Sequence, residues 1–239
     1  MAETGFPTEE VKIPSKGLVY PESHPFSSGV VEMKYMSTRE EDILTNQSFI
    51  EDGSVLDKVL KSMVIVDIDP KDIHPGDKNA LLVSSRILGY GKDYEYTYNS
   101  KTQKVDLTTL ENKPFDIDFI ERGVSSFELP SNGDIIGFKF LTEKEEDDAD
   151  KEIEQMAKIT QGHSATISTR LKYHIVSING DKDRNKIKNY IDNGLLASDS
   201  RALRNHIKKV SPDINLEVTI PGEGEVAIPI TLSFFWPDF

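Results

Sequence analysis

The spacing of apolar residues changes along this chain, and that change limits the folds it can adopt. From residue 55 to residue 64 the apolar positions come in pairs every four residues, which is typical of one face of a helix. These positions are Val55, Leu56, Val59, Leu60, Met63 and Val64. From Tyr94 onward the spacing falls to two, which is typical of strands. The sequence therefore predicts an α+β protein.

The predicted elements divide the chain into five segments. In chain order they are an extended arm and first strand at 1–36, a helical cluster at 37–92, a small antiparallel β-sheet at 93–142, an acidic link or helix at 143–160, and a helix pair with a C-terminal β-hairpin at 161–239. A length of 239 residues fits one large domain or two small ones. We therefore expect one or two compact units.

Local signals place some element boundaries. Ser37 and Glu40 have the spacing of a capping box, so a helix is expected to begin there. Helical spacing continues from Ile167 to Ile178. Alternating residues on both sides of the turn Pro221-Gly222-Glu223-Gly224 predict the C-terminal hairpin.

The composition excludes several kinds of protein. The chain has no cysteine, so it has no disulfide framework, thiol nucleophile, zinc ribbon or iron–sulfur cluster. No run of about 18 apolar residues is present, so no membrane span is expected, and the N-terminus lacks the apolar region of a secretory signal. The net charge of −13 disfavours nucleic-acid binding over the whole surface.

The first 30 residues contain four prolines and few apolar residues, so they are expected to form an extended arm. Leu18, Tyr20 and Phe26 would dock this arm, either on the chain itself or on a neighbouring protein. At the other end, Phe235, Trp236 and Phe239 belong to an aromatic cluster. Such a cluster suits either a core or an anchor in a partner's pocket.

Charge is distributed unevenly along the second half of the chain. Residues 143–154 carry eight acids and two lysines, a pattern typical of a solvated helix face or a flexible link. Residues 182–209 carry eight bases and three acids, a net charge of +5, and read as helix, turn, helix. That patch allows three interpretations: core helices with solvated bases, a surface for an acidic partner or for the chain's own acidic run, and a DNA-binding helix-turn-helix using Arg201 and Arg204.

No catalytic motif stands out. The chain lacks a phosphate loop, a G-x-S-x-G elbow and an H-E-x-x-H helix, and its five histidines are scattered. We expect no enzymatic activity, no cofactor and no metal. The alternative is an unrecognised site, which would need a deep pocket that gathers His163, His174 and nearby acids.

Taken in order along nearly the whole chain, several segments resemble the baseplate proteins of T-even-like contractile-tailed phages, namely the hub subunit and the related hub assembly factor. The segments are Ile13-Pro14-Ser15-Lys16-Gly17-Leu18 with Tyr20-Pro21, Glu40-Glu41-Asp42-Ile43-Leu44-Thr45, Gly76-Asp77-Lys78 to Arg86-Ile87-Leu88 with Tyr90-Gly91, Phe127 and Leu129-Pro130 before Gly137-Phe138-Lys139, Asp199-Ser200-Arg201-Ala202-Leu203-Arg204, Pro212-Asp213, and Phe234-Phe235-Trp236-Pro237. Some members of this family carry Cys-x-x-Cys pairs near the last hairpin and look zinc-binding. Here a Pro-Gly turn takes that place, so no metal is expected.

The resemblance implies a structural or assembly role in the baseplate hub, exerted through protein–protein contacts. The implied partners are other baseplate and hub proteins, with self-association as a further option. The implied locations are the virion tail baseplate and the host cytoplasm during assembly. The alternative function is a nucleic-acid-binding regulator that uses the helix-turn-helix at 182–209.

Overall fold

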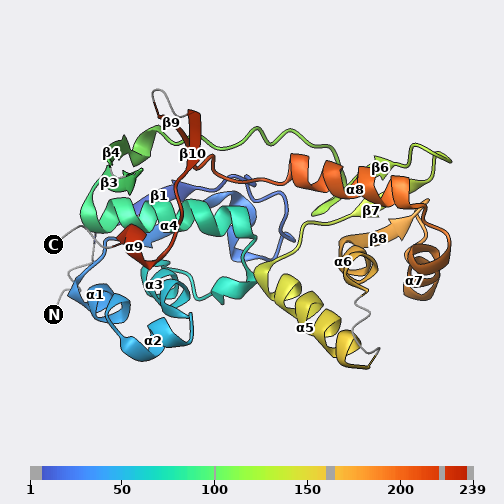
Figure 1. Ribbon diagram of the computed structural model, residues 1–239, viewed down its shortest axis with the longest axis horizontal. Coiled ribbons are helices and arrows are strands. Elements are labelled where there is room, and N and C mark those ends of the chain that lie inside the picture. Colours follow the sequence, from blue (N-terminus) through green and yellow to red (C-terminus); the bar gives the residue numbers. More distant parts are fainter. Residues whose placement is uncertain (1–6, 100, 160–164, 221–223, 236–239) are drawn as a thin grey trace.

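The computed structural model describes residues 7–99, 101–159, 165–220 and 224–235, and it has two lobes side by side along its longest axis (Figure 1). The fold is α+β, as predicted, with helices and several small antiparallel sheets. Each lobe has its own cluster of buried apolar residues. The first lobe combines residues up to about 110 with residues after 213, and the second lobe is formed by the chain between them.

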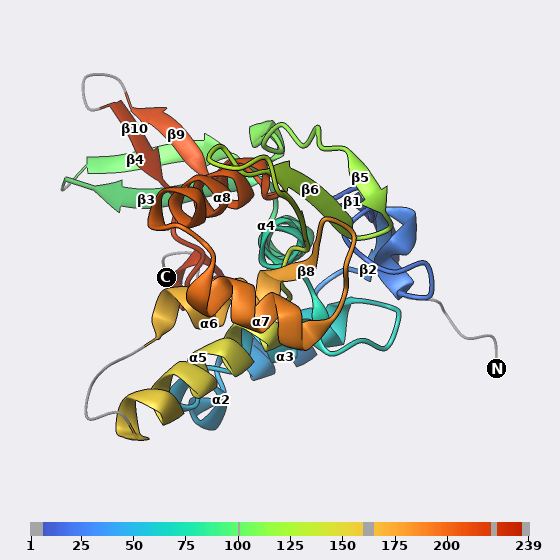
Figure 2. The same ribbon diagram turned by 90° about the vertical axis from the view of Figure 1, so that its right-hand side faces the viewer.

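The first lobe contains three two-stranded antiparallel sheets and most of the short helices. Its elements are β1 (Thr8–Lys12), η1 (Pro25–Ser28), β2 (Val30–Lys34), α1 (Thr38–Leu44), α2 (Gln47–Glu51), α3 (Val55–Met63), η2 (Pro70–Asp72), α4 (Pro75–Tyr90), β3 (Asp93–Tyr98), β4 (Lys101–Asp106), η3 (Leu107–Thr109), β9 (Glu217–Ile220), β10 (Gly224–Ala227) and α9 (Leu232–Phe235). The hairpins β3–β4 and β9–β10 lie beside each other in both views (Figures 1 and 2).

The second lobe is built on one four-stranded antiparallel sheet with the order β5-β6-β7-β8. Its elements are β5 (Phe119–Glu121), β6 (Val124–Glu128), β7 (Ile135–Phe138), α6 (Thr166–His174), β8 (Ile175–Ile178), α7 (Arg184–Asn193) and α8 (Ala197–Val210). The long helix α5 (Glu143–Ile159) lies between the lobes. The helices pack Leu171, Ile187, Ile191 and Leu203 onto buried Ile136 and Phe138.

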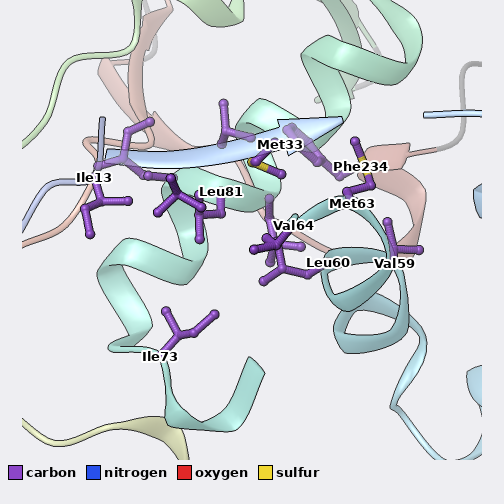
Figure 3. Close-up of a cluster of buried hydrophobic side chains, with 14 of the residues drawn as sticks. Ile13, Met33, Val59, Leu60, Met63, Val64, Ile73, Leu81 and Phe234 are labelled. Atoms are coloured by element: carbon purple, nitrogen blue, oxygen red, sulfur yellow. The ribbon is translucent and has the colours of Figure 1, made fainter. Parts of the chain in front are cut away.

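The apolar face of α3 forms the centre of the first core, as its spacing predicts. Val59, Leu60 and Met63 are fully buried. Figure 3 shows them facing Met33 of β2 and Phe234 of α9, which come from distant parts of the chain. The predicted start of the preceding helix is also confirmed, because the N–H and Oγ of Ser37 both donate to the carboxylate of Glu40.

The C-terminal segment packs against the first lobe rather than with the helix pair that precedes it in sequence. Ile214, Ile228, Phe234 and Phe235 are buried in the first core, whereas α7 and α8 pack in the second. The predicted unit 161–239 is therefore divided between the two lobes. The alternation of residues 216–220 identifies the first strand of a hairpin, but the return strand expected from Val226 to Phe235 ends at Ala227, and Leu232–Phe235 form helix α9. The pattern also does not identify which core covers the hairpin's apolar face.

The β region also differs from the single sheet expected at 93–142. The β3–β4 hairpin packs on the first core through Tyr94, and the sheet of the second lobe gains β8 instead. Residues 175–178 were expected to continue a helix that begins near Ile167. They form a strand because Ile-Val-Ser-Ile is rich in β-branched residues and the free edge of β7 pairs with it.

Residues 13–29 form a compact loop on the first lobe instead of an extended arm. Tyr20 and Phe26 are buried in the lobe's own core. Gly17 closes the loop with φ 75°, and a side chain there would overlap the backbone of residues 26–29. Arg122, in the β5–β6 turn of the second lobe, donates to three carbonyl oxygens of this loop, those of Gly17, Tyr20 and Ser27.

The chain crosses between the lobes on two segments that are hydrogen-bonded to each other. Asn112 and Ile214 form an antiparallel bridge. The amide of Lys113 donates to the carbonyl of Asp213 at 2.8 Å, and the amide of Asn215 donates to the carbonyl of Glu111 at 2.7 Å. The lobes are therefore joined by a short two-stranded connection.

The acidic run forms α5, and its carboxylates contact both lobes. Asp147 pairs with Lys71 and Glu143 pairs with Lys78 of the first lobe. Asp150 pairs with Arg170 of α6 in the second lobe at 2.5 Å. The run is thus a helix that joins the lobes through ion pairs, and its acids are not only a solvated face.

Candidate functional site: the joint between the lobes

A buried carboxylate holds the N-terminal loop on the start of α4. Asp77 accepts hydrogen bonds from the N–H of Ser15 at 2.9 Å, from Oγ of Ser15 at 2.6 Å and from the hydroxyl of Tyr20 at 2.7 Å. The Tyr20 hydroxyl also accepts from the N–H of His74 at 3.0 Å. Burial raises the pKa of Asp77, and it also raises the pKa of Tyr20, to which the nearby Asp77 charge adds. This network is an internal polar cluster with its donors and acceptors matched.

His74 caps α4 at the point where the lobes meet. Its Nδ1 accepts from the N–H of Gly76 at 3.2 Å, which assigns the ring proton of the neutral form to Nε2, 3.4 Å from Oγ of Ser211. The ring packs edge-on against Phe140. Burial lowers the pKa of His74 to about 4, so the side chain is neutral at pH 7.

As Asp77 does in the first lobe, a buried carboxylate in the second lobe fixes the start of a helix on a neighbouring segment. Asp199, in the first turn of α8, accepts from the N–H of Ser131 at 3.3 Å and from its hydroxyl. Ser131 lies in the β6–β7 turn, so this contact fixes the start of α8 on the sheet. The carboxylate is buried and occupied by hydrogen bonds.

The segments that carry the family resemblance meet in pairs at these contacts. Ser15 of the first segment bonds Asp77 of the third, and Asp213 accepts from the side chain of Asn79 at 3.1 Å. Gly76 lies so close to the carbonyl of Pro212 that a methyl group at that position would overlap it. Segments far apart in sequence therefore form one joint between α4, the N-terminal loop and the two connecting strands.

A cleft of about 620 Å³ opens beside this joint. The start of α4 lines one side through His74 and Asn79, and α6 and α8 line the other through Arg170 and Arg204. Nδ1 of His174 lies 2.9 Å from the Lys139 carbonyl, and burial lowers the pKa of His174, which also lines the cleft. The cleft thus contains two histidines with lowered pKa values beside exposed cationic side chains.

Some cationic side chains of the basic patch at 182–209 have partners within the chain, and others form no ion pair with a described residue. Lys182 pairs with Glu121, and Lys186 pairs with Asp181. The guanidinium of Arg184 donates to two backbone carbonyls. On α8, by contrast, Arg201, Arg204, Lys208 and Lys209 form no ion pair with a carboxylate of the described residues.

The α7–α8 pair has the order of a helix-turn-helix, with a connection at residues 194–196. The first turn of α8, however, is fixed on the β6–β7 turn through Asp199. Reading helices insert their N-terminal residues into the major groove. The exposed bases of α8 reach from Arg201 to Lys209 and so extend into its C-terminal half. This arrangement differs from that of a reading helix, whose N-terminal residues contact the bases.

The predicted partner-binding residues fall into three groups. Tyr20, Phe26 and Phe235 are buried in the first core, so the prediction that they contact a partner is corrected: their aromatic surface packs inside the chain. Leu18, Arg201 and Arg204 are at the surface, with Leu18 36% exposed. Trp236 and Phe239 lie outside the described residues.

The residues of the joint were not singled out from the sequence as a site. A signal for His74 and Asp77 was present, because His-Pro-Gly-Asp has a capping side chain, a proline at the first helical position and an acid in the first turn. That signal predicts a helix start and says nothing about which loop packs on it. Nothing in the sequence around Ser15 and Tyr20 indicates that their hydroxyls donate to the buried carboxylate of Asp77.

The alternative enzymatic site was expected to gather His163, His174 and nearby acids in a deep pocket. His163 lies outside the described residues, and His174 shares the cleft with His74 and Glu146. In the described part of the chain, no three histidines or acids are grouped so as to hold a metal ion. No helix in those same ranges is long and apolar enough to cross a membrane.

Comparison with known proteins adds no relative. No protein-family model, no curated protein and no solved structure matches this chain.

Proposed function

We propose that this chain is a structural or assembly component of the central hub of a contractile-tail baseplate and that it acts through protein–protein contacts. The observation that carries the proposal is the ordered set of segments that resemble the baseplate family. Ser15, Asp77 and Pro212, from three of these segments, lie at one buried joint. A set of residues that fixes the fold is what a family of scaffolding proteins would share.

The buried titratable groups support a scaffold. Asp77, Asp199 and Glu40 are all occupied by hydrogen bonds from neighbouring side chains and backbone. Burial alone would raise the pKa of Glu40, but hydrogen bonds from Lys34, Ser37 and Ser62 outweigh it and lower the pKa to about 2. Such groups hold elements together, because both carboxylate oxygens of each one already accept hydrogen bonds from within the chain.

In this proposal the chain locates to the virion tail baseplate, after assembly in the host cytoplasm, and its partners are other hub proteins or a second copy. The test is to introduce a stop codon early in the gene of the encoding phage and to examine tails by electron microscopy. We expect tails without a normal hub, restored by the intact gene. Intact tails, together with no contact between the chain and any hub protein, would overturn the proposal.

Mass spectrometry of mature particles separates the two roles within the proposal. A retained hub subunit is expected at a fixed ratio to other baseplate proteins. An assembly factor is expected in tail intermediates and absent from finished particles.

The unpaired bases of α8 favour one second candidate, a nucleic-acid-binding regulator. That function predicts a duplex DNA complex whose affinity falls steeply with salt, because each phosphate contact releases counterions. A gel-shift assay at low salt tests it, with Arg201→Gln/Lys209→Gln as the variant. Absence of a complex at low salt would remove this candidate.

A further inference from the structure

One cationic surface of this acidic protein forms no ion pair with an acid in the part of the chain that the structure describes. The acids of α5 pair with Lys71, Lys78 and Arg170 rather than with α8. The chain's own acidic run therefore does not cover the basic patch. Arg204 and Lys208 of α8 are left facing the cleft between the lobes.

The cleft is cationic although the chain carries a net charge of −13. Its charged lining residues are the cations Lys113, Arg170, Arg204 and Lys208 and the acids Glu146 and Asp213, four against two, a difference of +2. Asp213 is already paired with Lys113 at 3.0 Å. Burial raises the pKa of Glu146. Arg170 is paired with Asp150, which leaves Arg204 and Lys208 as the lining cations that form no ion pair with a described residue.

Both of these side chains have free hydrogen-bonding capacity. Nε of Arg204 donates to the Ser200 carbonyl of its own helix at 3.3 Å, and its terminal nitrogens form no hydrogen bond with any other described residue. A guanidinium with free terminal N–H groups is suited to bidentate contact with a carboxylate. Lys208, one turn further along α8, adds a second point of attachment.

Polar and apolar side chains form the remainder of the cleft wall. Among the apolar ones, Leu171 and Ile207 come from the second lobe and are 1% and 7% exposed. Phe140 is 7% exposed and packs edge-on against His74, so it offers no flat face to a nucleic-acid base. The charged side chains therefore provide the main contact surface of the cleft.

We propose that this cleft binds a short acidic segment of a neighbouring protein, with carboxylates on Arg204 and Lys208. Phe140 offers no flat face on which a base could stack, which favours peptide carboxylates over nucleic acid. The proposal rests on the proposed function in taking a protein as the partner. It adds the chemistry of the contact and its place between the lobes.

The test uses the full-length chain and an acetylated, amidated pentapeptide of four glutamates around a central leucine. Its control is the same peptide with glutamines, and affinity is measured by titration calorimetry at low and moderate salt. We expect the acidic peptide to bind, the glutamine peptide to bind at least about tenfold more weakly, and affinity to fall as salt increases.

Matched variants locate the site. Arg204→Gln/Lys208→Gln is expected to weaken binding about tenfold or more, because charge-assisted hydrogen bonds are lost. Arg201→Gln/Lys209→Gln removes the same charge from the same helix outside the cleft and is expected to change affinity less than about twofold. All four residues are exposed, so circular dichroism should show both variants folded.

Three outcomes would overturn the proposal: no binding of the acidic peptide at low salt, equal loss of binding in both variants, or tighter binding of an oligothymidylate of five nucleotides at the same site. These outcomes leave the proposed hub function untouched, because tail morphology tests that separately. Conversely, peptide binding at the cleft would support the cleft proposal even if tails form normally without the chain and the chain contacts no hub protein, the result that overturns the hub function.

Discussion

The two lobes differ in how much of the chain each one needs. The core of the second lobe comes from one continuous stretch between Phe115 and Ile207. The core of the first lobe combines residues from Ile13 to Leu107 with residues from Ile214 to Phe235. The first lobe is therefore complete only when the last residues of the chain have packed, whereas the second is closed by contacts within its own segment.

The largest expected effect comes from removing one core phenylalanine in each lobe. Phe235→Ala and Phe138→Ala should each lower the free energy of unfolding by about 3–5 kcal/mol, because both rings are fully buried. Hydrogen exchange should show the loss of protection first in residues 13–107 for Phe235→Ala and in residues 115–207 for Phe138→Ala. The exposed Tyr35→Ala is the control. Identical exchange patterns in the two core variants would mean that the lobes unfold as one unit.

The next effect compares the two buried carboxylates. Asp77→Asn and Asp199→Asn should each cost about 1–3 kcal/mol in urea unfolding, because the new amide group would face a donor. Asp77→Asn should cost more, since Asp77 accepts three hydrogen bonds and Asp199 accepts two. The exposed Asp93→Asn should be neutral. A larger cost for Asp199→Asn than for Asp77→Asn would contradict the expectation that the contact of Asp77 with the N-terminal loop contributes more to stability.

A pH effect is expected at the joint. The pKa of His74 is about 4 when folded, because of burial, against about 6.5 when unfolded. Stability is therefore unaffected by this group above pH 6.5 and falls as pH decreases from 6.5 towards 4, since only the unfolded state takes up the proton. For this one group, the free energy of unfolding changes by at most about 1.4 kcal/mol per pH unit.

His74→Asn should flatten that slope while keeping an acceptor at the helix cap. Urea unfolding between pH 5 and 7 measures the difference between the variant and the original chain. An unchanged slope would show that His74 is not the group responsible.

The smallest effect concerns ion pairs within and between lobes. Lys182→Ala removes an exposed pair with Glu121 inside the second lobe and should cost less than about 1 kcal/mol. Lys78→Ala removes a largely buried lysine that pairs with Asp57 and with Glu143 of α5, so it should cost more. Thermal unfolding at two salt concentrations checks both variants. Added salt should reduce the effect of Lys182→Ala more than that of Lys78→Ala, because the Lys182 pair is exposed.

Local features of the fold were predictable from the sequence. The apolar pairs of α3, the start of α1 at Ser37 and the strand pairing of β9 with β10 follow from spacing and turn residues within about a dozen positions. These signals are local because helix faces and tight turns depend on neighbouring residues. The α+β class follows from them directly.

Long-range placement was not predictable in the same way. Alternation in residues 216–220 indicates that one face of that strand is covered, yet either core could cover it. The same limit applies to Phe235, for which a core and a partner's pocket were both compatible with the pattern. Ile175–Ile178 became a strand because β7 had an open edge, which is a property of the assembled lobe. The joint at Asp77 depends on the same kind of long-range packing.

The two connecting strands have a mechanical consequence. The described ends of the chain, residues 7 and 235, both lie in the first lobe, and the Asn112–Ile214 bridge closes the second lobe off as a loop. A force pulling on the two ends therefore passes through the first lobe and across that bridge. Tension along the chain reaches the second lobe only after the bridge opens, whereas the ion pairs of α5 and the hydrogen bonds of Arg122 are loaded together with the first lobe.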